Sequence, residues 1–143
     1  AYAYCVWAEL ELPREARWQY AAQGPDGRTY PWGNDAPDAG GMNRANYDPG
    51  VDEADGHAYA APVGSYGPGA PAPRADGSSP FGALDTAGNV WEWTNDWYSG
   101  TGPDRVYRGG GFLSAVTAYL RAASRYSSAP DDRVRSMGFR VSR

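Results

Sequence analysis

The chain has 143 residues, the size of one domain. Its formal net charge is −4 and every basic residue is arginine, a balance that does not favour nucleic acid as a partner. Cys5 and His57 are the only residues of their types, which excludes a disulfide within the chain, the zinc and iron sites that need several such ligands, and any nucleophile–histidine triad without His57.

The first half of the chain predicts helix followed by long loops. Residues 1–9 have the composition of the end of a helix, and since the chain starts inside this pattern without Met, we expect an upstream part of the domain. Pro13 begins a second helix that continues to Ala21 and stops at Gly24. Residues 25–80 are dense in turn-forming residues, which by itself would indicate disorder. Recurring aromatics favour loops pinned to a core.

Short antiparallel strands are predicted for the second half, at residues 90–97, 105–108, 120–125 and 138–141. Gly88-Asn89 forms a turn before the first of them, and residues 109–111, all glycine, form a bend after the second. These elements predict an α+β fold with one or two helices and long irregular loops. No stretch approaches the ~20 apolar residues of a membrane span.

Several motifs follow one another along the chain: Leu-Pro-Arg-Glu-Ala-Arg-Trp at 12–18, Tyr-Pro-Trp-Gly at 30–33, Gly-Asn-Val-Trp-Glu-Trp at 88–93, Arg-Gly-Gly at 108–110 and Gly-Phe-Arg-Val at 138–141. In this order they resemble the formylglycine-generating-enzyme (sulfatase-modifying factor) family, a variant of the C-type lectin fold. The resemblance implies a single domain over residues 1–143 that lacks the N-terminal strand and helix usual in the family.

The oxidases of that family bind copper through a pair of cysteines shortly after Arg-Gly-Gly. Residues 111–119 contain no cysteine. Ser114 falls near one expected position, but a hydroxyl does not replace a soft thiolate ligand. The resemblance therefore implies a non-enzymatic domain that requires no cofactor. A sulfatase-modifying-family enzyme and a generic lectin-fold accessory or sensor domain remain the alternatives.

Residues 109–140 resemble, more narrowly, the variable proteins of diversity-generating retroelements. The fixed pattern of those proteins is matched by Arg-Gly-Gly at 108–110, Arg-Ala-Ala-Ser-Arg at 121–125, Pro-Asp-Asp-Arg at 130–133 and Gly-Phe-Arg at 138–140. Adenine mutagenesis of AAY codons cannot yield Lys, Glu, Gln, Met or Trp, and residues 112–136 contain none of the five. The alternative is ordinary drift in a non-catalytic domain.

This resemblance predicts a diversified surface that binds an unknown protein or cell-surface ligand. Tyrosines, serines and apolar residues suit such recognition. The predicted ligand-binding residues are Phe112, Leu113, Ser114, Val116, Ala118, Tyr119, Ser124, Tyr126, Ser128, Ala129, Asp132, Val134, Arg135 and Ser136. Four of them, Phe112, Tyr119, Tyr126 and Val134, should be exposed on one face.

Other residues near this segment are predicted to belong to the scaffold. Leu120, Ala123 and Met137 should pack inward. Four arginines should support the fold, paired with carboxylates where these are in reach: Arg121, Arg125, Arg133 and Arg140. The targeting of the chain is open; we expect a soluble prokaryotic or phage-encoded protein, either cytoplasmic or surface-displayed.

The resemblance also implies a structural calcium ion at the Gly-Asn-Val-Trp-Glu turn, held by the side chains of Asp85 and Glu92 and the carbonyls of Gly88 and Val90. A metal-free turn closed by hydrogen bonds is the alternative. A second family site maps loosely to Asn46, Tyr47, Asp55 and His57. The tryptophans at 91, 93 and 97 either form a sugar-binding platform or, as we expect, pack in the core.

Overall fold

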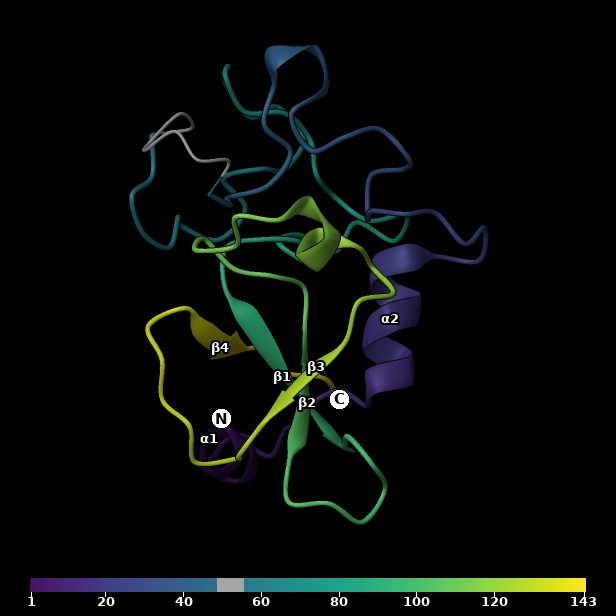
Figure 1. The fold of residues 1–143 in the computed structure, drawn as a ribbon, viewed down its shortest axis with the longest axis vertical. Helices are drawn as coiled ribbons and strands as arrows, with labels where there is room; N and C mark the ends of the chain where they lie inside the picture. The colour runs from purple at the N-terminus through teal and green to yellow at the C-terminus, as the bar shows by residue number, and fades with distance from the viewer. Residues whose placement is uncertain (49–55) are drawn as a thin grey trace.

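The computed structural model of the chain describes residues 1–48 and 56–143 (Figure 1). Two helices, α1 (Tyr2–Trp7) and α2 (Glu15–Gln23), precede a four-stranded sheet. The strands are β1 (Trp91–Trp97), β2 (Arg105–Arg108), β3 (Tyr126–Ser128) and β4 (Met137–Phe139), and short 3-10 turns lie at η1 (Ala39–Gly41) and η2 (Thr117–Leu120). The expected α+β class is confirmed. No helix in the described residues is long and apolar enough to cross a membrane.

The strand order in the sheet is β3-β2-β1-β4. The β1–β2 and β2–β3 pairs are antiparallel, as expected. The β1–β4 pair is parallel, with Trp93 opposite Phe139, which corrects the expectation of an all-antiparallel sheet. The chain can return to β1 in this direction because residues 129–136 form a long loop between β3 and β4 (Figure 1).

The two faces of the sheet have different neighbours, because successive side chains of a strand point to opposite sides. On one face, Glu92 of β1 accepts a hydrogen bond from Trp18 of α2. On the other, Trp91 and Trp93 contact the ring of Tyr107 on β2. The second face is partly covered by α1, whose Cys5 joins Trp93 in the core.

Helix α2 follows the predicted signals. Pro13 precedes its first turn, and the helix ends at Gly24, which has φ 71°. Trp18 and Ala22 are four residues apart, lie on one helix face and are buried with Ala122. Tyr20 points away and is exposed.

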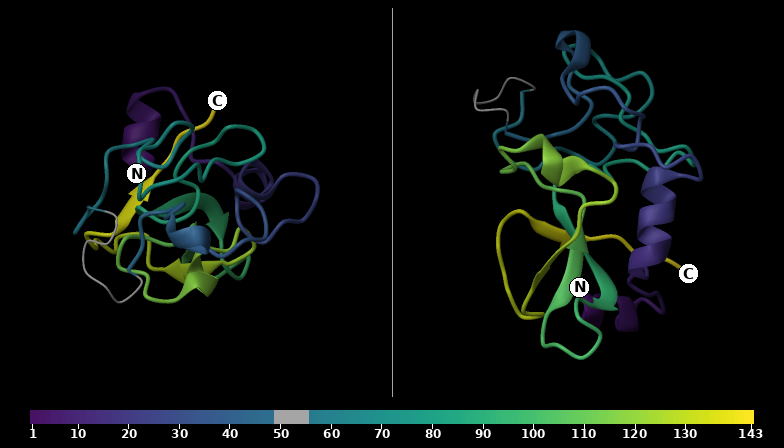
Figure 2. Two further views of the ribbon diagram at one scale, coloured as in Figure 1. Left: turned by 90° about the horizontal axis from the view of Figure 1, so that it is seen from above. Right: turned by 45° about the vertical axis from the view of Figure 1, so that its right-hand side comes forward.

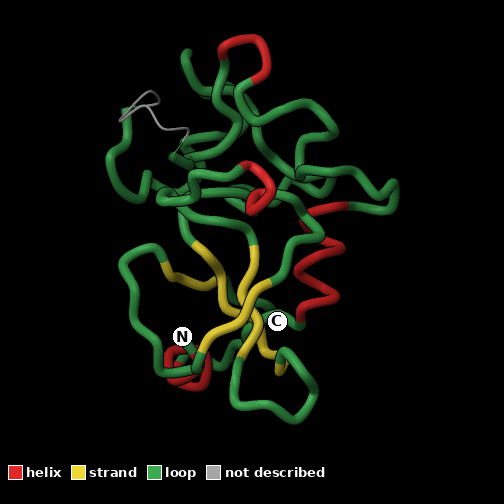
Figure 3. The backbone as a smooth tube through the Cα atoms, viewed as in Figure 1, coloured by secondary structure: helices red, strands yellow, loops and turns green. Residues whose placement is uncertain are grey.

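The loops of the first half gather at one end of the molecule, above the sheet, whereas both chain termini lie near the sheet (Figures 1 and 2). Little of this region is regular structure (Figure 3). Tyr30 and Tyr47 are nevertheless buried, in a cluster with Ala45, Ala87 and Leu120. The prediction that aromatics pin these loops to a core is confirmed for Tyr30, Tyr47 and Tyr66, whereas Tyr59 is exposed.

One predicted strand is wrong. Residues 120–125 do not pair in the sheet; η2 ends at Leu120, and the strand begins only at Tyr126. The intervening carbonyls are instead hydrogen-bonded by the Arg108 side chain, and Ala122 N–H bonds to the carbonyl of Thr29. Tertiary partners thus replace the strand ladder in this segment.

Candidate functional site

The turn before β1 connects distant loops. Gly88 has φ +75°, and a Cβ at this position would lie 2.4 Å from the carbonyl oxygen of Asn46, so the close approach requires glycine. The buried Asn89 amide bonds in both directions with Ala61: it accepts from the N–H at 2.8 Å and donates to the carbonyl at 3.2 Å. Hydrogen bonds therefore hold this turn to the loop at Ala61.

Glu92 does not fit the calcium role. Its buried carboxylate accepts hydrogen bonds from Trp18 Nε1 at 2.6 Å and from Arg140 Nε and Nη2 at 2.6 and 2.7 Å. A guanidinium thus already neutralises this carboxylate, and a divalent cation would have to displace it. Asp85, the other proposed side-chain ligand, accepts from Gly64 N–H at 2.7 Å.

The second candidate metal site is only partly within the described residues. Asp55 lies outside them. Asn46 and Tyr47 are buried, and the Asn46 amide donates to the carbonyl of Tyr59 and to Asn89 Oδ1. The described residues contain no group of three or more His, Cys, Asp and Glu placed to hold a metal ion.

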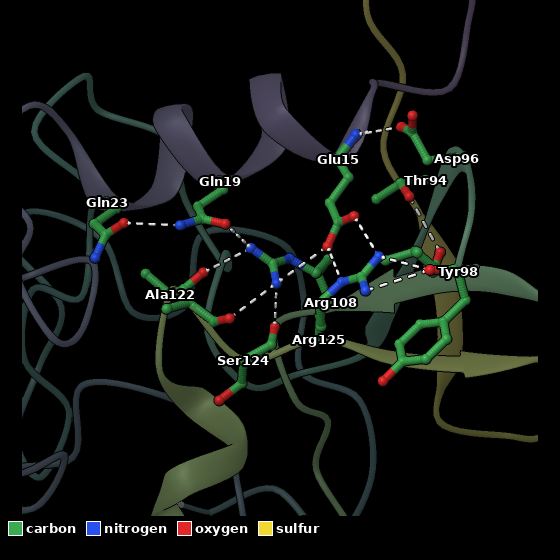
Figure 4. A network of polar contacts seen from close by, with 12 residues as sticks. Glu15, Gln19, Gln23, Thr94, Asp96, Tyr98, Arg108, Ala122, Ser124 and Arg125 are labelled. Carbon is green, nitrogen blue, oxygen red and sulfur yellow. Dashed lines mark hydrogen bonds and ion pairs between the residues drawn. The ribbon is translucent and has the colours of Figure 1, made fainter. Parts of the chain in front are cut away.

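A buried guanidinium lies between α2 and residues 122–124 (Figure 4). Arg108 at the end of β2 is fully buried and donates to the carbonyls of Ala122, Ala123 and Ser124 at 2.7–3.1 Å. It also donates to Gln19 Oε1 at 2.5 Å. Burial lowers the pKa of Arg108, and the Glu15 carboxylate 3.4 Å away opposes that shift.

Glu15 also pairs with a second arginine. Arg125 donates to both Glu15 oxygens, at 2.8 and 2.9 Å, and lies 4.3 Å from the ring of Tyr98. The hydrogen bond from Arg125 to Glu15 raises the pKa of the guanidinium. The carboxylate pairing expected of Arg125 and Arg140 is present.

The other two scaffold arginines behave differently. Arg121 and Arg133 are exposed, and neither forms an ion pair with the residues that the structure describes. For these two positions the expected pairing is not seen.

Three of the predicted ligand-binding residues are buried, which corrects the prediction for them. Phe112 is 5% exposed and packs edge-on against Tyr59. The hydroxyl of Ser114 is turned inward to accept the N–H of Gly111 at 3.0 Å. Ser136 is buried beside β1, where its carbonyl accepts Trp91 N–H. These side chains complete the scaffold.

Of the four residues expected to be exposed on one face, only Val134 is exposed, because Phe112 is buried and Tyr119 and Tyr126 are half-buried. The remaining predicted ligand-binding residues are exposed or half-buried. Leu113, Val116 and Val134 are 46, 50 and 55% exposed. Asp132 and Arg135 are also exposed, and the half-buried members are Ala118, Tyr119, Ser124, Tyr126, Ser128 and Ala129. Of the three residues expected to pack inward, Leu120 is buried and Met137 is partly buried. Ala123 is exposed, and only its backbone carbonyl contacts the interior, where it accepts a hydrogen bond from Arg108.

Four half-buried aromatic side chains meet on the sheet face opposite α2; we call them the aromatic cluster. Trp91 contacts the other three, with ring centroids 5.0 Å from Tyr107, 5.8 Å from Tyr119 and 5.2 Å from Tyr126. Tyr119 and Tyr126 meet edge to face at 5.3 Å. The sheet contributes Trp91 and Tyr107, and the predicted variable segment contributes the other two.

The tyrosines of the aromatic cluster lie in a partly desolvated environment. Burial raises the pKa of Tyr107, and Tyr126, Asp132 and Tyr119 raise it further. The three phenol hydroxyls have no hydrogen-bond partner among the described residues. Polar tips above an apolar base are typical of recognition surfaces.

The three tryptophans of the alternative sugar platform do not form a single surface. Trp93 is buried in the core beside Cys5, while Trp91 is half-buried in the aromatic cluster. Trp97 is 40% exposed, and the guanidinium of Arg105 lies 3.4 Å from its ring centroid. Core packing, the expected reading, holds for Trp93 alone.

Comparison with known families identifies the fold and its lineage. All of residues 1–143 match the sulfatase-modifying factor enzyme 1-like domain. The chain belongs to this family. Its α+β fold is thus the formylglycine-generating-enzyme variant of the C-type lectin fold.

Members of the sulfatase-modifying factor family similar to this chain carry different names. A formylglycine-generating enzyme of Streptomyces coelicolor is 41% identical over 163 residues, covering 98% of this chain and 48% of that protein. Inactive C-alpha-formylglycine-generating enzyme 2 of Bos taurus is 32% identical, covering 98% and 46%. The chain thus spans about half the length of these relatives, and family membership does not decide between catalysis and its absence.

A solved structure links the family fold to variable proteins. Treponema denticola variable protein 1 aligns with a TM-score of 0.73 and 25% sequence identity, covering 92% of this chain and 46% of that one.

Sequence reasoning missed two residues that organise this member of the sulfatase-modifying factor family. Arg108 was seen only as part of a motif, and no local signal showed that its side chain hydrogen-bonds the carbonyls of residues 122–124. Tyr107 was read only as a strand residue. Its alternation with Val106 in β2 placed it on one sheet face, but nothing local showed which face remains partly open.

Proposed function

We propose that the chain is a non-catalytic ligand-binding scaffold, the variable protein of a diversity-generating retroelement, with its diversified surface on residues 112–136. One observation carries this proposal: buried side chains that flank the segment anchor its backbone, while several varied positions within it are exposed. Arg108 and Arg140, at fixed pattern positions on either side of the segment, are tied to the carbonyls of residues 122–124 and to Glu92. The fixed Arg121 and Arg133 inside the segment are exposed and form no ion pair with the described residues. Val116, Asp132 and Val134, at varied positions, are exposed.

This division is what a diversified surface requires. Side chains that make no structural hydrogen bond can change without cost to the fold, whereas a change at Arg108 would leave three carbonyls without donors. The likeness to Treponema denticola variable protein 1 supports the same reading. The ligand would be a protein or cell-surface molecule bound through the exposed varied side chains.

A genomic observation tests the diversification. The DNA beside the gene should hold a near-copy of the segment that encodes residues 112–136, differing from it only at adenines, and a reverse transcriptase gene. Sequencing the flanking DNA of the source organism checks this. A complete flanking sequence with neither element overturns the retroelement proposal and leaves a lectin-fold accessory or sensor domain.

The second candidate is an enzyme of the sulfatase-modifying family, favoured by the 41% identity to a formylglycine-generating enzyme. Its copper site would need thiolates after Arg-Gly-Gly, where this chain has Ser114, and that hydroxyl already accepts a backbone N–H. We expect no copper-dependent oxidation of a cysteine-containing peptide. Turnover by the purified chain, measured by mass spectrometry of the peptide, would establish the enzyme instead.

A further inference from the structure

A pocket lies beside the second half of β1, bordered by α1 and by the loop 129–136 (Figure 1). Its volume is about 500 Å³, within the range of about 300–1,000 Å³ that is typical of small-molecule sites. Leu12 and Trp93, which belong to one core cluster, give the lining an apolar part. We propose that this pocket binds a small zwitterion, an α-amino acid with an apolar side chain.

The charged residues of the pocket are of both signs. Two guanidiniums and two carboxylates line it, and their formal charges cancel: Arg105, Arg133, Asp131 and Asp132. None of the four forms an ion pair with the described residues. Ala1 also lines the pocket, and an amino group there would add positive charge. The pocket therefore suits neither a simple cation nor a simple anion, but a ligand that carries both charges.

The sheet keeps opposite charges near each other without joining them. Arg105 of β2 lies opposite Ser128 of β3, so their side chains share one face of the sheet. The Arg105 guanidinium lies 3.4 Å from the ring centroid of Trp97 and donates to the carbonyl of Asn95 at 2.9 Å. The Ser128 hydroxyl donates to Asp132. Neutral groups thus hold both charged side chains, and their other donors and acceptors are available to a ligand.

An α-amino acid matches these groups. Its ammonium and its carboxylate are separated by a single carbon, so one small ligand presents both charges to the same pocket. A guanidinium binds a carboxylate through two parallel hydrogen bonds, and an ammonium donates to carboxylate oxygens. An apolar side chain on the ligand would cover the hydrocarbon and ring surface of Leu12 and Trp93.

This site is separate from most of the proposed diversified surface and does not depend on diversification. Of the residues that line the pocket, only Asp132 is among the predicted ligand-binding residues. Arg133 was expected to pair with a carboxylate and forms no ion pair with the described residues. The carboxylate of a bound amino acid would supply that partner.

Leucine and its blocked derivatives test the inference, because each derivative removes one charge. Leucine, N-acetyl-leucine, leucinamide and N-acetyl-leucinamide would each be titrated into the isotope-labelled chain. NMR shifts of the Trp93 and Trp97 indole N–H groups and of the backbone at 131–133 report the site. We expect leucine to bind about two- to fivefold more tightly than either singly charged derivative, the effect of one partly exposed ion pair. Glycine should bind at least about fourfold more weakly than leucine, the effect of burying a single methylene group.

Variants show which residues meet which end of the ligand. Arg133→Gln should weaken leucine and N-acetyl-leucine about two- to fivefold and should not weaken leucinamide. Asp131→Asn combined with Asp132→Asn should weaken leucine and leucinamide by a similar factor and should not weaken N-acetyl-leucine. The controls are Arg121→Gln and Asp38→Asn, at exposed positions that do not line the pocket, and they should change nothing.

Three results would overturn the inference: N-acetyl-leucinamide binding as tightly as leucine, glycine binding as tightly as leucine, or no shift at these nuclei at millimolar leucine. None of them bears on the genomic test. A near-copy template found together with a failed leucine titration leaves the variable protein standing and rejects only the amino-acid site.

Discussion

Arg140 Nε and Nη2 donate to the two oxygens of Glu92 at 2.6 and 2.7 Å, and so tie the residue after β4 to the neighbouring strand β1. The Glu92 carboxylate is 6% exposed and also accepts Trp18 of α2, so a single carboxylate joins three parts of the fold. Breaking such a pair leaves a charge without its partner.

Glu92→Gln should therefore destabilise the chain by about 2–4 kcal/mol, at the lower part of the range for buried pairs because the Arg140 side chain keeps 30% exposure. Urea unfolding at neutral pH measures the loss. Asp26→Asn, which breaks the exposed pair with Arg28, is the control and should have little effect. Equal effects of the two variants would contradict the bracing role.

Arg108→Lys should be destabilising although it keeps the charge. An ammonium cannot span the carbonyls of residues 122–124 and Gln19 Oε1 as the planar guanidinium does. We expect a loss of about 2–4 kcal/mol from the unmet buried acceptors. In this variant, the backbone amides of residues 118–126 should exchange their hydrogens faster than the amides of β1. Wild-type stability in this variant would mean that the network does not hold the segment.

Exposed varied positions should tolerate polar residues. Leu113→Asn, Val116→Ser and Val134→Asn should each change the free energy of unfolding by no more than about 0.5 kcal/mol. Leu120→Ala, in the same segment but fully buried, should cost about 2–5 kcal/mol. Thermal denaturation of the four variants compares them. A large loss at an exposed position would show that it belongs to the scaffold.

Comparing Gly88→Ala with Gly82→Ala separates the cost of a steric contact with the Asn46 carbonyl from the cost of a positive φ. Gly82 has the same φ of +75° but nothing within 4 Å of an added Cβ, whereas at Gly88 the Cβ would lie 2.4 Å from the Asn46 carbonyl oxygen. Gly82→Ala should cost about 1–2 kcal/mol from the left-handed backbone alone. Gly88→Ala should cost about 1–3 kcal/mol more. Similar unfolding midpoints for both variants would argue against the close contact.

Tyr107 should make stability fall at alkaline pH. Burial and the groups around it raise its pKa, so the folded chain holds the phenolic proton to a higher pH than the unfolded chain does. The unfolded chain then binds fewer protons above its own tyrosine pKa of about 10, and stability is lost as pH rises from there through the folded pKa. Tyr107→Phe should flatten this fall, whereas Tyr2→Phe, at an exposed position, should not. Urea unfolding between pH 9 and 11 checks the difference, and identical slopes would rule out a contribution from Tyr107.

Local signals predicted the elements whose causes are local. Gly24 ends α2 because its positive φ is open to glycine, and Pro13 lies directly before the N-cap residue Arg14 rather than at the first helical position that the sequence suggested. The strand before residue 126 was misplaced, because the backbone there is satisfied by a side chain from a distant strand. The parallel pairing of β4 with β1 was also missed, because the local sequence predicts a strand but not the strand with which it pairs.

The candidate site divides in the same way. The sequence by itself determined the family, the missing cysteines and the restricted residue types of 112–136, because these are properties of the letters and their order. Only the tertiary structure decided that Phe112 and Ser114 face inward while Val116 and Val134 face out, and that Glu92 holds Arg140. Burial and charge pairing depend on contacts between residues far apart in the chain, and local sequence patterns do not predict these contacts.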